Sequence, residues 1–78
     1  MKNSMKLHEA KPGYTGTITS IDGDTRFLSR ITSIGLTQGC KIEIMQNEKN
    51  QPVLLLGRDS LIAVNRKDCE RIEVNKHE

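Results

Sequence analysis

The amino-acid sequence predicts a mainly β domain, a small barrel of about five short strands with one helix inserted after the first strand. The apolar residues are mostly Ile, Leu and Val, with one Tyr, one Phe and no Trp, and this bias favours strands. The segments of strand character are short and closely spaced, as in small barrels. After the first of them, the spacing of apolar residues changes from that of a strand to that of a helix.

The first predicted strand, 15–21, is a run rich in Thr and Ile. It follows the turn signal Lys11-Pro12-Gly13 and stops at Asp22-Gly23-Asp24, since Gly, Pro and Asp favour turns and disfavour strand interiors. The sequence therefore predicts one bounded strand at the start of the domain.

The helix is predicted from apolar residues at positions i, i+1, i+4 and i+7, which lie along one stripe of a helix. These residues are Phe27, Leu28, Ile31 and Ile34. Asp24 is placed to cap the first turn. Gly35 follows the last apolar position, where a left-handed residue commonly closes a helix, and Leu36 can then fold back onto the last turn.

Three further segments complete the predicted barrel. In 40–45, Cys40, Ile42 and Ile44 alternate with polar residues or Met45, which predicts a half-buried strand. The runs 53–56 and 61–64 are apolar on both faces and are joined by a hairpin turn at 57–60. The outward apolar face of this hairpin is either covered by the helix or free to bind a partner. A short turn at 66–70 leads to the closing strand 71–74.

The folded domain is thus expected to span residues 7–74, with flexible tails at 1–6 and 75–78. A formal charge of +2, with both signs interspersed, is too small to predict a strong nucleic-acid surface. The sequence holds no stretch of about 20 apolar residues and no signal peptide. We therefore expect a cytoplasmic protein without membrane insertion, in which Cys40 and Cys69 are reduced thiols.

Groups suited to catalysis or metal binding are sparse, so the sequence predicts neither an enzyme nor a bound cofactor. The two histidines lie at the entry to the barrel (His8) and in the C-terminal tail (His77), and neither is spaced to activate a nucleophile. Cys40 and Cys69 are 29 positions apart and remote from His8, unlike the closely spaced ligands of a metal site. The phase of Cys40 makes it a small core residue.

The most distinctive stretch is the apolar helix end followed by Gly35-Leu36, a short turn and Gly39. Further positions of the same pattern are Leu7, Lys11-Pro12-Gly13, Gly16, Ile18, Ile21, Ile62-Ala63-Val64, Cys69, Ile72 and Val74. Together they resemble the FeoA family over nearly the whole chain. The sequence departs from that pattern at Ala10 and Gln38, and Cys69 occupies a position of the pattern that is often Ala. The resemblance implies an SH3-like barrel that carries a helix.

The resemblance also implies a function: a small cytosolic accessory protein of bacterial ferrous iron uptake that binds the membrane transporter FeoB. Two alternatives remain open. One is a regulatory barrel of the kind fused to metal-dependent repressors, although the chain has no helix-turn-helix. The other is nucleic-acid binding, with Arg58, Arg66, Lys67 and Arg71 as phosphate contacts, although only Tyr14 and Phe27 could stack on bases. Weak self-association is compatible with each.

A partner contact is predicted on the helix and the turn after it, because this family-specific stretch lies outside the strands that any barrel requires. An apolar side chain beside an arginine is a pairing common at interfaces. The residues predicted for this contact are Arg30, Ile31, Ile34, Leu36 and Thr37. The competing possibility is that the stretch only closes the barrel.

Overall fold

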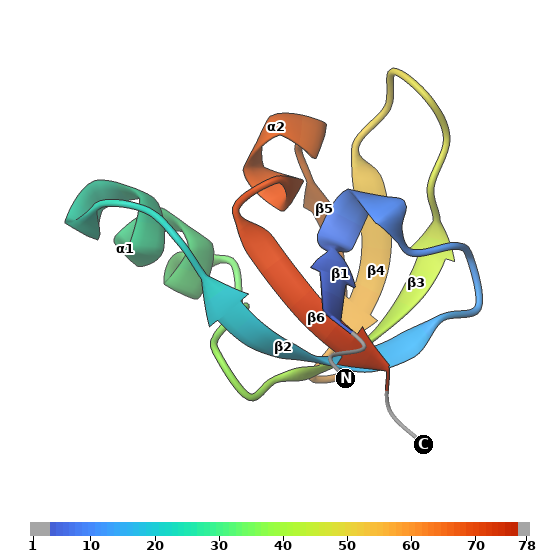
Figure 1. Cartoon of the computed structure of the whole chain (residues 1–78), viewed down its shortest axis with the longest axis horizontal. Helices are drawn as coiled ribbons and strands as arrows, with labels where there is room; N and C mark the ends of the chain where they lie inside the picture. Colours follow the sequence, from blue (N-terminus) through green and yellow to red (C-terminus); the bar gives the residue numbers. More distant parts are fainter. Residues whose placement is uncertain (1–3, 77–78) are drawn as a thin grey trace.

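The fold is one six-stranded antiparallel sheet that curls around a hydrophobic core, with a helix standing off to one side (Figure 1). The computed structural model describes residues 4–76. In chain order the elements are β1 (Ser4–Lys6), the 3-10 turn η1 (Leu7–Glu9), β2 (Thr15–Ile21), α1 (Thr25–Ser33), β3 (Lys41–Gln46), β4 (Val53–Gly57), β5 (Ser60–Val64), α2 (Arg66–Cys69) and β6 (Ile72–Lys76).

The strands lie in the order β1-β6-β2-β3-β4-β5, so the last strand in the chain sits between the first two. β2 pairs with β3 through its first half and with β6 along most of its length. β3, β4 and β5 then follow as two antiparallel pairs. The mainly β class, with the helix after strand 15–21, is confirmed, and that strand is the second of six because β1 precedes it.

The sheet extends beyond the predicted domain boundaries. Ser4–Lys6 form a strand that pairs with residues 73–75 of β6, and β6 itself runs to Lys76. The prediction of tails at 1–6 and 75–78 is therefore wrong at 4–6 and 75–76, and residues 1–3 and 77–78 lie outside the described residues. β1 was not predicted because its three side chains are only partly buried and do not alternate between apolar and polar. Only the backbone hydrogen bonds to β6 identify it as a strand.

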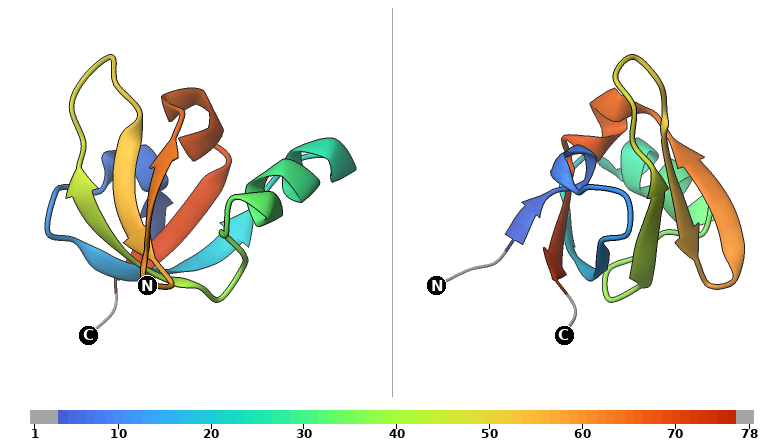
Figure 2. Two further views of the ribbon diagram at one scale, coloured as in Figure 1. Left: turned by 180° about the vertical axis from the view of Figure 1, so that it is seen from behind. Right: turned by 90° about the vertical axis from the view of Figure 1, so that its right-hand side faces the viewer.

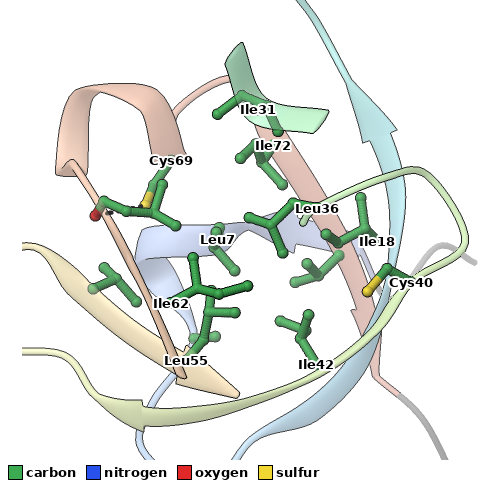
Figure 3. Close-up of a cluster of buried hydrophobic side chains, with 14 of the residues drawn as sticks. Leu7, Ile18, Ile31, Leu36, Cys40, Ile42, Leu55, Ile62, Cys69 and Ile72 are labelled. Carbon is green, nitrogen blue, oxygen red and sulfur yellow. Dashed lines mark hydrogen bonds between the residues drawn. The ribbon is translucent and has the colours of Figure 1, made fainter. Parts of the chain in front are cut away.

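The core is built almost entirely from aliphatic side chains that point inward at every second position of the strands (Figure 3). β3 contributes Ile42 and Ile44, and β4 contributes Val53 and Leu55. Other fully buried members are Leu7, Ile18, Ile31, Leu36, Cys69, Ile72 and Val74. The predicted core position of Cys40 is confirmed, since its side chain is buried in this cluster. The hairpin β4–β5 turns only one of its two apolar faces into this core.

The predicted ends of the helix are confirmed. The Asp24 carboxylate accepts a hydrogen bond of 2.9 Å from the backbone N–H of Phe27, which caps the first turn. Gly35 follows the helix with φ +106°, a left-handed conformation that glycine adopts without steric cost. The N–H of Leu36 then donates to the carbonyl of Ile31 over 3.2 Å, which turns the Leu36 side chain back into the core.

A polar network holds the open end of the barrel together. Nη1 of Arg66, in α2, lies 2.7 Å from Oδ1 of Asn47 and 2.9 Å from the carbonyl of Glu48. The Asn47 amide in turn donates to the carbonyls of His8 and Ala10 over 2.8 and 2.7 Å. These bonds join α2, the β3–β4 loop and η1, three segments that the strand ladder does not connect.

Replacing Gly16 by alanine is expected to destabilise the domain by about 2 kcal/mol, the range of overpacked sites. A Cβ at this position would lie 2.4 Å from the backbone carbonyl oxygen of Asn75, which belongs to the paired strand and cannot move freely. Denaturant unfolding measures the change. Gly57→Ala is the matched control, because a Cβ there meets nothing closer than 3.7 Å. Equal losses in the two variants would contradict this explanation.

Asn47→Ala is expected to cost about 2 kcal/mol of unfolding free energy, because two backbone carbonyls lose their donor and Arg66 loses an acceptor. Lys49→Ala, at an exposed position of the same loop, should change stability by less than about 0.5 kcal/mol. Thermal or urea unfolding of both variants tests the network. A stable Asn47→Ala protein would show that the strands alone close the barrel.

Candidate functional site

A groove lies between α1 and the α2–β6 segment. α1 leans away from the barrel, while α2 and the start of β6 stand opposite it (Figures 1 and 2). The groove has a volume of about 400 Å³, and most of the side chains that line it are charged. They are Asp24, Arg26, Phe27, Arg30, Lys67, Asp68, Glu70 and Arg71.

Two arginines from separate elements lie against Phe27. The guanidinium carbons of Arg30, on α1, and Arg71, immediately before β6, are each 5.4 Å from the centre of the Phe27 ring. Arg30 also forms a two-point ion pair with Asp68, with N–O distances of 2.9 and 3.4 Å. Because the Arg30 side chain is 55% exposed, this pair orients the guanidinium more than it stabilises the fold.

The structure separates the five residues predicted for partner contact. Arg30, Ile34 and Thr37 remain at least partly accessible, and Ile34 keeps 40% of its surface exposed. Ile31 and Leu36 are buried, at 1% and 0% exposure, so their prediction as contact residues is wrong for this fold. The Schellman-like return of the chain after Gly35 places Leu36 in the core, where it packs as a structural residue.

The predicted apolar stripe of α1 is likewise only half buried. Phe27 and Ile31 reach the core, but Leu28 and Ile34 stay 38% and 40% exposed. The helix leans away from the barrel (Figure 2), which is consistent with the exposure of these two side chains.

The outer face of the β4–β5 hairpin is not covered by α1. Leu61, on the edge strand β5, is 60% exposed. Its neighbour Ala63 is exposed too, and the cross-strand residues Leu56 and Leu54 are half-buried. The molecule therefore offers two apolar surfaces, one on the helix and one on the hairpin.

The four cations considered for phosphate binding do not share a surface. Lys67 and Arg71 line the groove beside α1. The Arg66 guanidinium points to the β3–β4 loop, where it binds carbonyls. Arg58 lies in the β4–β5 turn, beside a hollow formed by β2 and β3 residues. Lys67 also lines a second hollow together with Arg66, so at most two of the four cations line any one hollow.

Among residues 4–76, no group of three or more His, Cys, Asp or Glu side chains could hold a metal ion. Both cysteines are free and buried. Burial raises the pKa of the Cys69 thiol to about 12, although the nearby Arg66 cation lowers it in part. The Cys69 Sγ lies 3.8 Å from the carbonyl of Val64, so this thiol packs as a protonated, unreactive core group.

The fold and the described side chains thus define a small, mainly β, SH3-like domain. A scan against family models matches the FeoA domain over residues 5–76, and the chain belongs to the FeoA family. This family is non-catalytic and associated with ferrous iron transport. None of the helices in the described part of the chain is long and apolar enough to cross a membrane.

Solved structures agree with this fold. The chain superposes on the crystal structure of an iron uptake regulatory protein (FeoA) with a TM-score of 0.91 at 24% identity, covering 95% of this chain and 99% of that one. The FeoA protein from Chlorobium tepidum gives 0.83 at 25% identity, with 95% and 71% coverage. A manganese-dependent transcriptional repressor gives 0.89 at 16% identity, covering 99% of this chain but 44% of that one. A sequence search of curated proteins returned no match.

The buried thiol predicts a loss of stability in alkaline solution. The unfolded chain releases the Cys69 proton near pH 9, whereas the folded chain holds it up to about pH 12, so the free energy of unfolding falls as the pH rises through this window. Between pH 8.5 and 9.5 the loss from this group is about 0.7 kcal/mol. Urea titrations across the window should show a steeper decline for the wild type than for Cys69→Ala. Parallel declines would contradict the burial of this thiol.

Proposed function

We propose that the chain is a cytosolic accessory protein of bacterial ferrous iron uptake, which acts by binding the cytosolic part of the membrane transporter FeoB. The observation that carries the proposal is membership of the FeoA family over residues 5–76, combined with the accessible apolar side chains Leu28 and Ile34 at the helix. A domain of this kind is suited to recognise another protein.

The surface proposed for the transporter is the accessible flank of α1 and the turn that follows it. Ile34 presents an apolar side chain one helical turn after Arg30, and Thr37 follows in the turn. An exposed apolar group beside an oriented arginine is a combination found at the centre of protein interfaces. Ile31 and Leu36 support this surface from below instead of touching the partner.

The outer face of the β4–β5 hairpin is the competing surface for the same partner. Leu61 is more exposed than any apolar residue of α1. The helix is favoured because Arg30 adds an oriented charge to its apolar side chains, and a charged group steers association.

A regulatory role like that of a metal-dependent repressor is the second candidate class. The superposition on the manganese-dependent repressor supports a shared barrel, but a sequence identity of 16% supports similarity of fold and not of role. The family match therefore favours iron transport over this reading.

Ile34→Ser is expected to weaken binding to the soluble part of FeoB by about tenfold, the size expected for the loss of an interface anchor. Because Ile34 is 40% exposed, the variant should remain folded by circular dichroism. Titration calorimetry with the purified transporter domain measures the affinity.

Leu61→Ser is the matched control, since it removes an equally large apolar side chain from the competing surface. Its affinity should equal that of the wild type. Loss of binding in Leu61→Ser with none in Ile34→Ser would place the contact on the hairpin, and absence of binding by the wild type would refute the proposed partner.

A further inference from the structure

We infer that the groove between α1 and the α2–β6 segment binds the carboxylates of an acidic peptide segment carried by a protein partner. The inference deepens the proposed function and rests on it only for the identity of that partner.

The first support is the charge that the groove leaves unpaired. It contains four cations and three carboxylates. Two of the carboxylates are already engaged, because Asp24 caps α1 and Asp68 pairs with Arg30. Within the described range 4–76, neither Arg26, Lys67 nor Arg71 forms an ion pair. The cap hydrogen bond leaves the charge of Asp24 in place, so the four cations exceed the three carboxylates by one, and the groove has a small surplus of positive charge.

The second support is the way Arg71 is held. Its guanidinium carbon lies over the Phe27 ring, 5.4 Å from the ring centre, and this cation–π contact leaves its N–H donors available to a ligand. No side-chain or backbone acceptor binds those donors in the described part of the chain. A planar guanidinium with free donors matches the two oxygens of a carboxylate. Arg30, which pairs with Asp68, lies at the same distance from the centre of the Phe27 ring.

A peptide fits the groove better than a nucleic acid does. With three carboxylates beside its four cations, the groove has too small a positive surplus to hold a continuous phosphate chain, whereas a single carboxylate needs only one arginine. Phe27 is 6% exposed beneath the two guanidiniums, so no aromatic face is free to stack on a base. A volume of about 400 Å³ accommodates a few side chains.

The test is a titration of isotope-labelled protein with a hexaglutamate peptide blocked at both ends, followed by NMR at low ionic strength. Shifts are expected to concentrate at residues 26–30 and 67–71 and to diminish with added salt. Hexaglutamine should produce none. In Arg71→Gln the affinity should fall about tenfold. Arg71→Lys should recover only part of it, because lysine keeps the charge without the planar donors.

Arg58→Gln is the matched control, an exposed arginine in the distant β4–β5 turn, and it should bind hexaglutamate like the wild type. Equal losses in Arg58→Gln and Arg71→Gln, or shifts scattered over all basic residues, would overturn the inference. A short single-stranded RNA that binds the groove more tightly than hexaglutamate would overturn it too, in favour of a phosphate ligand.

Binding to the FeoB domain is measured in the same variants, which separates the two proposals. Hexaglutamate binding in the groove without any FeoB binding would refute the proposed partner and uphold the groove. If FeoB binding persists while hexaglutamate produces no shifts, the inferred role of the groove would be overturned and the proposed partner would stand.

Discussion

The closure of the barrel depends on the hydrogen bonds that converge on Asn47 and Arg66. Because β1 and β5 form the two edges of the sheet and do not pair with each other, the strand ladder alone leaves the barrel open. The side-chain oxygen of Asn47 accepts a hydrogen bond from Arg66, and its amide group donates to the carbonyls of His8 and Ala10. One side chain of the β3–β4 loop thus connects α2 with η1 and the residue after it. With that end fixed, α2 holds a defined position, and the groove opposite α1 has one wall that the rest of the fold keeps in place.

Most of the fold could be predicted because the strands and the helix carry local signals. The alternation in β3 and the cap at Asp24 each follow from a few neighbouring residues. β1 could not be predicted, because its pairing with β6 is decided about 70 residues further along the chain. The periodicity of α1 correctly gave the direction of its apolar face, but periodicity does not tell how much of that face another element covers. Leu28 and Ile34 therefore remained exposed against expectation.

The candidate site was harder to predict than the fold, for the same reason. Arg30 could be singled out from the helix pattern. Lys67 and Arg71 were singled out only as possible phosphate contacts, because the sequence does not show that the fold brings them opposite α1. For Leu36 the opposite happened, because a residue predicted to contact a partner lies in the core. Its place in the most family-specific stretch suggested a contact with another protein, but a residue that follows a left-handed glycine commonly packs back onto its own helix. A family-specific position can thus belong to the core of the fold.

The place of β6 inside the sheet has a consequence for how the chain folds during synthesis. β6 is the last strand to leave the ribosome, yet both β1 and β2 need it as a neighbour. Until residues 72–76 emerge, β1 has no partner and the second half of β2 is unpaired, although the pairs β2–β3, β3–β4 and β4–β5 can form ahead of them. The first strands must therefore stay soluble until β6 has been synthesised. Their Thr, Ser and Lys side chains favour solubility in the nascent chain, as they do on the surface of the folded domain.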